Sequence, residues 1–258
     1  MSHFLPLICQ TLLAFLIATN VKAQNMNLAF ESRAKQTALL ELYTSEGCSS
    51  CPPAEVWLSR LNASPGLWKD FVPVAFHVDY WDYLGWKDKL GARQFSDRQR
   101  AYAAEWRNDT VYTPGFVLNG REWRDWAGQK DGPRDTGAAA GVLSVSSTDT
   151  NHWRVSFAPT NAGDGDYQVH AALLLSGVNS DVRAGENQGR RLNHDFAALT
   201  LAGAPLVRKD NVAQGEFVLT PPRETGKGDL ALAVWVTEKG KLEPLQATGG
   251  WVRRGDGL

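Results

Sequence analysis

Two cysteines separated by two residues, Cys48 and Cys51, constrain this chain more than any other feature of its sequence. The remaining cysteine, Cys9, lies in an apolar stretch near the N-terminus. A structural disulfide stabilises a protein mainly by closing a long loop of the unfolded chain, and a bridge across two residues closes almost none. The pair therefore indicates redox chemistry or metal binding rather than a covalent staple.

The first 23 residues have the features of a secretory signal peptide. An apolar run from Phe4 to Ala18 is followed by small or medium side chains at the positions that a signal peptidase reads, ending at Ala23. The run is too short for a comfortable membrane span. We therefore expect residues 1–23 to be removed and the mature chain to be periplasmic or secreted, without a stable membrane span. An uncleaved anchor is the alternative, because His3 is the only basic residue before the run.

Charge and composition narrow the class of protein further. The formal net charge of the 258-residue chain is −1, which gives no electrostatic basis for binding nucleic acid. Hydrophobic residues make up 43% of the chain, enough for a packed core. The length allows two domains of ordinary size.

The pattern over residues 37–145 predicts an α/β domain. Ala38–Thr44 is an apolar run typical of a buried strand, and apolar residues at helical spacing predict a helix from Pro52 to about Asn62. Phe71–Val78 is a second apolar strand. These elements predict a βαβ unit, with the cysteine pair where the first strand enters the helix.

A helical insertion and a hairpin complete this predicted domain. Residues 89–107 carry apolar side chains at helical spacing. A Pro-led strand over residues 111–118 then ends in Asn119-Gly120, a strong hairpin turn signal. Residues 135–143, rich in Ala and Gly, predict a closing helix.

The pattern changes after a polar stretch, Ser144–Asn151, which we interpret as a linker. Residues 151–258 contain short apolar runs separated by turn residues, which favours a mostly antiparallel, β-sandwich-like domain. The predicted strands are Trp153–Ala158, Tyr167–Leu175, Gly215–Leu219, Leu230–Thr237 and Gly250–Val252.

The position of Cys48 before a helix suits a nucleophilic thiolate. Unpaired N–H groups and the helix dipole stabilise a thiolate there, and the thiolate is the attacking species in disulfide exchange. We expect Cys48 to be the more exposed cysteine and the nucleophile, and Cys51 to resolve the mixed disulfide. Pro52 and Pro53 weaken the dipole argument, since they place the start of the regular helix at about Pro52.

Thr113-Pro114 opens the later strand and is the second candidate site feature. If this peptide bond is cis, it would place the Thr113 backbone beside the cysteines, where an extended substrate peptide would pair with it. A trans bond at the start of an edge strand is the alternative.

Other polar and aromatic residues leave alternatives open. His77 is either a hydrogen-bonded, partly buried side chain or a metal ligand that joins the cysteines, because thiolate and imidazole suit copper or zinc. The aromatic residues between Tyr80 and Trp86 either line a substrate groove or anchor the insertion. The polar segment Gly185–Arg191 is interpreted as an ordinary turn rather than a partner contact.

Several of these stretches together resemble the thioredoxin superfamily and, more closely, an exported bacterial family of unknown function. They are Thr44–Ala54 (Thr-Ser-Glu-Gly-Cys-Ser-Ser-Cys-Pro-Pro-Ala), His77–Asp88, Gln99–Tyr102, Tyr112–Pro114 and Gly185–Arg190. The resemblance implies a thioredoxin-like fold, export from a bacterial cell and redox chemistry. Unlike ordinary thioredoxins, the chain has two serines between its cysteines.

We therefore expect an α/β thioredoxin-like domain with a helical insertion over residues 37–145 and a β-sandwich-like domain over residues 151–258. The expected function is thiol–disulfide exchange with a cysteine-containing protein or a small thiol. Its site residues are Cys48, Cys51, Thr113 and Pro114, and no cofactor is expected. The alternatives are a copper- or other metal-handling protein that uses the two cysteines and His77, and a non-enzymatic interaction module.

Overall fold

The computed structural model describes residues 28–253 except 135, 148, 150, 162–164 and 223–226. The expected signal peptide, residues 1–23, lies outside the described residues.

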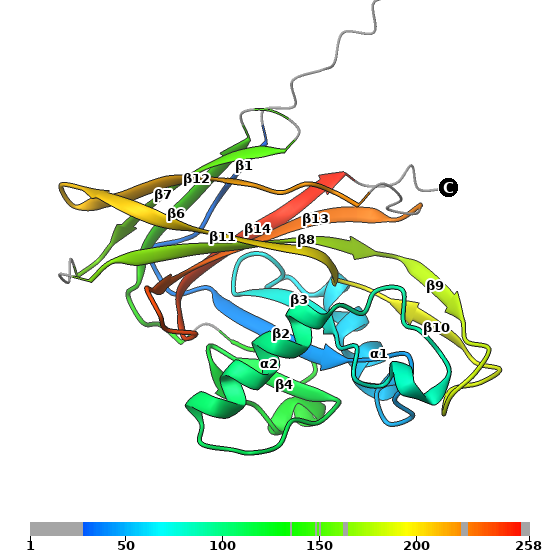
Figure 1. Ribbon diagram of the computed structural model, residues 1–258. Coiled ribbons are helices and arrows are strands. Elements are labelled where there is room, and N and C mark those ends of the chain that lie inside the picture. The colour runs from blue at the N-terminus through cyan, green and yellow to red at the C-terminus, as the bar shows by residue number, and fades with distance from the viewer. Residues whose placement is uncertain are drawn as a thin grey trace, which may run out of the picture.

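Strands dominate the described chain (Figure 1). Twelve of them form one mixed sheet, and β9 and β10 form a separate hairpin. The strands are β1 (Ala29–Glu31), β2 (Ala38–Thr44), β3 (Phe71–His77), β4 (Gly115–Leu118), β5 (Arg121–Glu122), β6 (Gly141–Ser147), β7 (His152–Pro159), β8 (Tyr167–Ser176), β9 (Val178–Asp181), β10 (Arg191–His194), β11 (Ala197–Lys209), β12 (Val212–Val218), β13 (Asp229–Glu238) and β14 (Pro244–Arg253).

Two α-helices occur in the described residues, α1 (Pro52–Arg60) and α2 (Arg93–Glu105). Short 3₁₀ turns occupy Leu61–Ala63, Asp82–Leu84 and Asp125–Gly128. None of the helices in this part of the chain combines the length and apolar character that crossing a membrane requires.

The predicted βαβ unit is present. β2 and β3 run parallel with α1 between them in the chain, and every residue of both strands is buried. β4 pairs antiparallel with β2 and turns through Asn119-Gly120 into β5. Both turn residues have positive φ, 48° and 79°, which Asn and Gly tolerate better than other residues.

The predicted fold class is wrong, because the molecule is mostly β and one sheet joins the two predicted parts. β3 pairs in parallel with β11 at Ala75 and Ala197, and β11 pairs antiparallel with β8. An α/β thioredoxin-like domain with a helical insertion, followed by a separate β sandwich, does not describe this arrangement. The bridging strand β11 went unpredicted, since its Ala- and Gly-rich first half has no clear period.

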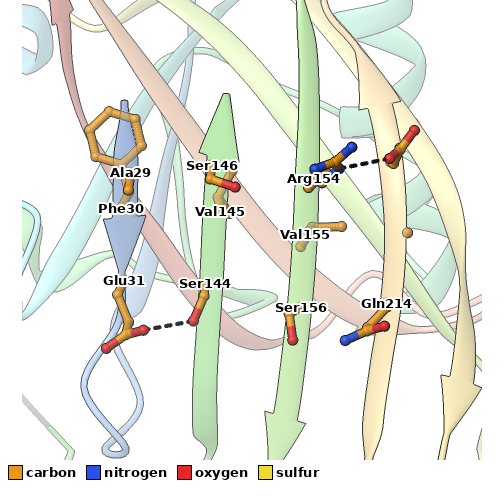
Figure 2. Close-up of a pocket in the computed structure, with 12 residues that line it drawn as sticks. Ala29, Phe30, Glu31, Ser144, Val145, Ser146, Arg154, Val155, Ser156 and Gln214 are labelled. Atoms are coloured by element: carbon orange, nitrogen blue, oxygen red, sulfur yellow. Dashed lines mark hydrogen bonds and ion pairs between the residues drawn. The ribbon is translucent and has the colours of Figure 1, made fainter. Parts of the chain in front are cut away.

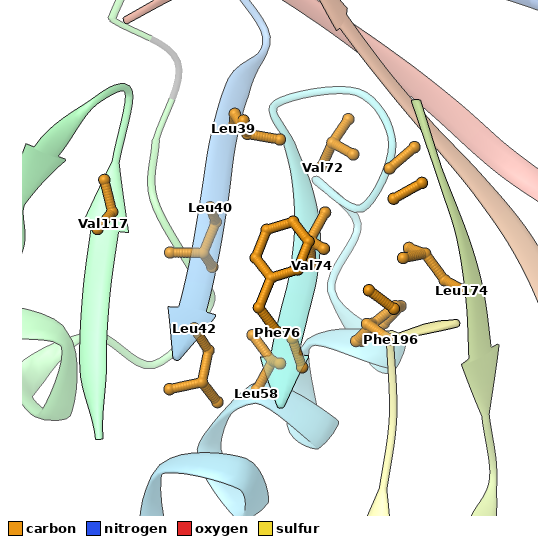
Figure 3. Close-up of a cluster of buried hydrophobic side chains, with 14 of the residues drawn as sticks. Leu39, Leu40, Leu42, Leu58, Val72, Val74, Phe76, Val117, Leu174 and Phe196 are labelled. Carbon is orange, nitrogen blue, oxygen red and sulfur yellow. The ribbon is translucent and has the colours of Figure 1, made fainter. Parts of the chain in front are cut away.

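The hydrophobic core also crosses the predicted boundary. In Figure 3, Leu40 on β2 and Val74 on β3 share a cluster with Leu174 on β8 and with Phe196, which precedes β11. All four side chains are 0% exposed. The α1 face adds Leu58, also buried, so strands from both parts of the chain enclose this cluster.

The region around residue 144 differs from its prediction. The described part of residues 135–143 contains no helix, and β6 begins at Gly141. Leu143 and Val145 are buried and alternate with more exposed serines, which is the period of a strand. The expected linker Ser144–Asn151 therefore begins inside β6, which pairs with β1 and β7.

The other expected elements are found with shifted ends. α2 lies inside the helix predicted over residues 89–107. The five strands predicted after residue 151 correspond to β7, β8, β12, β13 and β14. Strands β1, β9, β10 and β11 were not predicted. The domain boundaries over residues 37–145 and 151–258 stay a prediction.

Candidate functional site

Cys48 and Cys51 form a disulfide at the junction of β2 and α1, with their Cα atoms 5.5 Å apart. Cys51 is the N-cap of α1, and the regular helix begins at Pro52 as expected. The Cys51 N–H donates to the Cys48 carbonyl oxygen at 3.2 Å, which closes the short loop as a turn. The cysteine pair therefore sits at the helix start, as its sequence position predicts.

The first turn of α1 offers little to a thiolate. Pro52 and Pro53 have no N–H group, and the Ala54 and Glu55 N–H groups both donate to the Cys51 carbonyl oxygen at 2.9 and 3.2 Å. The N–H groups that were expected to stabilise a thiolate are therefore absent or already bonded.

Both cysteines are shielded from solvent. Cys48 and Cys51 are each 1% exposed, whereas Ser49 and Ser50 between them are exposed. The expectation that Cys48 is the more exposed cysteine is wrong. A reacting partner reaches the sulfur atoms only if a neighbouring segment moves.

Thr113 and Pro114 lie beside this disulfide loop, and the peptide bond between them is cis. The Ser50 hydroxyl donates to the Thr113 carbonyl oxygen at 3.4 Å and also lies 3.4 Å from the Cys48 sulfur. The structure thus brings Thr113, with Pro114 next to it in the chain, to Ser50 between the predicted cysteines, across 63 residues of chain.

An aromatic loop covers a second side of the site. Trp81 Nε1 donates to Thr113 Oγ1 at 2.8 Å, and Trp86 Nε1 donates to Glu46 Oε2 at 2.5 Å. A Cβ added at Gly47 would lie 2.9 Å from the Trp81 Cβ, so the close approach of this loop requires glycine. Tyr83 differs from both tryptophans, because it is 79% exposed. The loop therefore anchors the site and presents one aromatic ring to solvent.

The loop between β9 and β10 holds the disulfide loop from a third side. Asn187 is 0% exposed, and its Nδ2 donates to the carbonyl oxygens of Glu46 and Cys48 at 2.9 and 2.8 Å. The Glu186 carboxylate accepts from the Ser49 N–H at 3.0 Å. Arg190 Nη1 donates to Asn187 Oδ1 at 2.8 Å and orients the amide. The segment Gly185–Arg191, which was interpreted as an ordinary turn, thus holds the disulfide loop in place through hydrogen bonds.

Five buried ionisable side chains gather next to the disulfide loop: Glu46, Glu55, His77, Asp88 and His194. His194 Nδ1 lies 2.5 Å from Glu55 Oε2, and its Nε2 lies 3.1 Å from Glu46 Oε1. His77 Nδ1 lies 2.7 Å from Asp88 Oδ2, and the two imidazole centroids are 5.0 Å apart. We call these five residues the buried histidine–carboxylate cluster.

Ion pairing outweighs burial at this cluster. Burial alone would lower the pKa of His194, but bonds to Glu46 and Glu55 raise it to about 10. Burial opposes the charge of Asp88, yet His77 lowers the pKa of Asp88 to about 2. The pKa of Glu46 is likewise lowered, because bonds that include one from His194 outweigh its burial. The cluster therefore holds opposite charges in contact beneath the disulfide loop.

Sequence reasoning missed most of this cluster. Glu46 and Asp88 lie inside the stretches that carry the family resemblance, and this position could have marked them as candidate site residues. Glu55 follows Cys51 by one helical turn. His194 had no signal, since it reaches α1 from a strand that was not predicted.

The structure brings a metal-ligating set together within the cluster rather than at the cysteines. Glu55, His77 and His194 place one ligand atom each within 4.8 Å of one another. Cys48 and Cys51 are bonded to each other. A metal at His77 would therefore take its other ligands from Glu55 and His194 in this state.

A groove of about 620 Å³ lies elsewhere, over β1, β6, β7 and β12 (Figure 2). Two pairs of its polar side chains bond across neighbouring strands, Arg154 with Glu216 and Ser144 with Glu31. None of its lining residues belongs to the disulfide site. The groove presents no constellation of reactive groups.

The fold and the site define a mostly β protein that holds a CxxC disulfide beneath covering loops. Residues 39–237 match the family described as "Protein of unknown function (DUF1223)", and the chain belongs to this family. This confirms the expected membership of a family of unknown function.

Two solved structures resemble the chain. Protein AGR_C_4864 from Agrobacterium tumefaciens is 24% identical, with a TM-score of 0.59 over 88% of this chain and 98% of that one. HBP35 of Porphyromonas gingivalis is 13% identical, with a TM-score of 0.59 over 85% of this chain and 76% of that one. At these identities the likeness concerns the fold alone. No curated protein matches the chain.

Proposed function

We propose that the chain is an exported thiol–disulfide oxidoreductase that acts through Cys48 and Cys51. The observation that carries the proposal is a disulfide across two residues, which closes almost no loop and so has little structural purpose. The bond from the Ser50 hydroxyl to the Thr113 carbonyl oxygen, which sets the disulfide loop beside the Thr113 backbone, supports the same function.

The chemistry is a pair of exchange steps. A substrate thiolate attacks the Cys48 sulfur, forms a mixed disulfide and releases Cys51 as a thiolate that takes up a proton. A second substrate thiolate attacks the substrate sulfur of the mixed disulfide and releases Cys48. The substrate pair is then oxidised and the cysteine pair reduced, and the same steps in reverse reduce a substrate disulfide.

A cysteine-containing protein or a small thiol is the proposed partner, and the periplasm or the cell exterior is the proposed location. Disulfides persist in such oxidising compartments. Kinship of the CxxC segment with the thioredoxin superfamily is part of this proposal. It rests on the order of strand, cysteine pair, helix, strand and Thr-Pro, and does not extend to the fold of the whole chain.

Trapping of the mixed disulfide tests the proposal. Cys51→Ala leaves Cys48 to form a mixed disulfide that no second cysteine resolves. Cys48→Ala leaves only Cys51, whose role is to resolve a mixed disulfide and not to form one. Both variants are incubated with a model peptide disulfide, and adducts are counted by mass spectrometry on the peptides that contain residues 48 and 51. The proposal requires adducts at Cys48 in the first variant and far fewer in the second. If neither variant forms adducts, and the wild type neither oxidises nor reduces model thiols, the proposal is wrong.

A further inference from the structure

One ring nitrogen of His77 is buried and finds no partner among the described residues. The residue is 0% exposed, its Nδ1 bonds to Asp88, and no described residue makes a hydrogen bond with its Nε2. A buried polar atom without a partner costs about 1–3 kcal/mol. The hydrogen bonds of the described residues leave this atom unexplained, which points to a ligand for it.

Two further ligand atoms face the same point. Glu55 extends from α1 and His194 from β10, and these offer ligand atoms within 4.8 Å of one another and of a ring nitrogen of His77. The three side chains come from a helix and two strands, which are rigid supports. Two imidazoles and one carboxylate form a known zinc ligand set that leaves a coordination position to water.

Each of these three side chains is oriented by a second group. Asp88 lies 2.7 Å from His77 Nδ1, and Glu46 lies 3.1 Å from His194 Nε2. Thr44 Oγ1 donates to Glu55 Oε1 at 2.6 Å. Metal-ligating histidines almost always present their other nitrogen to a carboxylate, a carbonyl or water. His77 Nε2 is then left for the ion, and His194 Nδ1 and Glu55 Oε2, which lie 2.5 Å apart, would exchange their mutual bond for bonds to it.

We propose that Glu55, His77 and His194 bind a divalent transition-metal ion of borderline softness, for which Zn²⁺ is the probe. Calcium and magnesium fit poorly, because these hard cations take six or more oxygen ligands. The ligand set contains no sulfur, so it differs from a site at the cysteines. The proposal stands whether or not Cys48 and Cys51 exchange disulfides.

An ion at this point would join three segments of the chain. Glu55 lies four residues after Cys51, and His194 ends the hairpin whose loop clamps the disulfide loop (Figure 1). Bound metal would therefore fasten the hairpin to α1. We expect it to stabilise the oxidised protein through its preferential binding to the folded state.

The test uses full-length protein with its disulfide intact. Protein stripped with a chelator is titrated with Zn²⁺ in a calorimeter, and retained zinc is measured after gel filtration. We expect one zinc ion per chain and a rise in the melting temperature. Replacing Cys48 and Cys51 together by serine leaves both results unchanged, because the site does not use sulfur.

Two conservative variants remove one ligand each. His77→Asn keeps a donor towards Asp88 but lacks Nε2, and His194→Gln keeps a donor towards Glu46 but lacks Nδ1. Each is expected to weaken zinc binding by roughly 100-fold or more, since loss of an outer-shell partner already costs roughly 10–100-fold. His170→Gln, at a histidine outside the cluster, is the matched control and binds zinc as the wild type does.

Cobalt in the wild type keeps the proposal testable if the variants fail to fold. Bound Co²⁺ is expected to show visible absorption bands without the near-ultraviolet band of a thiolate ligand. The proposal is overturned if the oxidised wild type does not retain zinc, and the cluster is then a set of proton-linked ion pairs. It is also overturned if zinc binds only when the cysteines are reduced.

Discussion

Glu41 and Arg98 form an ion pair inside the core. Arg98 Nε and Nη2 lie 2.7 and 3.0 Å from the two Glu41 oxygens, and the Tyr43 and Tyr102 hydroxyls donate to the same carboxylate. Burial first, and then the Glu41 charge, raises the pKa of both tyrosines well above the usual value. The hydroxyls therefore remain donors at any ordinary pH, and every member of this network has a partner.

Breaking this pair is predicted to be costly. Glu41→Gln leaves the Arg98 charge buried without its counter-charge, so we expect a loss of about 3 kcal/mol in the free energy of unfolding. Urea denaturation measures it. Asp97→Asn is the control, because its pairs with Arg93 and Arg100 are exposed and should be worth less than about 1 kcal/mol. Equal effects of the two substitutions would show that the buried ion pair contributes no more to the free energy of unfolding than the exposed pairs do.

His170 predicts a pH dependence of stability. It stacks on Trp235, and burial, with a smaller effect of Arg98, lowers its pKa from 6.5 to about 4. The unfolded chain therefore binds a proton that the folded chain refuses, and stability falls as the pH drops from 6.5 towards 4. His170→Gln can keep the bond to Thr237 but does not titrate.

The difference between His170→Gln and the wild type isolates this effect from that of the carboxylates. As the pH drops from 6.5 towards 4, we expect the wild type to lose about 2 kcal/mol more unfolding free energy than the variant loses. Denaturant unfolding at several pH values measures it. A difference that stays constant with pH would mean that His170 is not a neutral buried imidazole.

At the scale of elements, the β9–β10 loop is predicted to control access to the disulfide. Asn187→Ala removes two hydrogen bonds that hold the disulfide loop. We expect dithiothreitol to reduce the Cys48–Cys51 bond at least about 10-fold faster, since the loss of roughly 1 kcal/mol per bond favours the open loop. Reduction is followed by alkylation and mass spectrometry.

Asn179→Ala is the matched control for this prediction. Asn179 lies on β9 of the same hairpin and is exposed, whereas Asn187 is buried against the disulfide loop. Its substitution should leave the reduction rate unchanged. Equal rates in Asn187→Ala and the wild type would show that opening of another segment, such as the aromatic loop, limits access.

Local patterns predicted the elements that carry their own signals. The βαβ unit follows from two continuous apolar runs around a helix-period segment, and the β4–β5 hairpin follows from Asn119-Gly120. The spacing of the two cysteines predicted the redox pair, and the Pro-led strand predicted the place of Thr113. The burial of Cys48 could not be predicted, because Asn187, which bonds to its carbonyl oxygen, lies 139 residues away in the chain.

Long-range pairing explains the larger errors. The path of the sheet through β11 depends on Ala75 meeting Ala197, and neither residue type signals its partner. Residues 135–143 have helix-forming alanines, but the pairing of β6 with β1 and β7 fixes the strand from Gly141 onwards. Tertiary contacts overrode local propensity in both places.

At the scale of the whole molecule, the continuous sheet and core predict a single unfolding transition. β3 and β11 are hydrogen-bonded neighbours, and one hydrophobic cluster spans both predicted parts. We expect scanning calorimetry to give one peak, with calorimetric and van't Hoff enthalpies that agree. Two resolved transitions would mean that the parts before and after residue 150 are stable independently.

A redox titration of the folded protein decides whether Cys48 and Cys51 are an exchangeable pair. The oxidised protein is equilibrated over a series of glutathione redox ratios, and alkylation is measured by mass spectrometry on the peptide that contains both cysteines. We expect both thiols to appear together, in a reversible two-electron transition, while circular dichroism shows that the fold persists. A disulfide that opens only when the protein unfolds would show that the pair is structural and not redox-active.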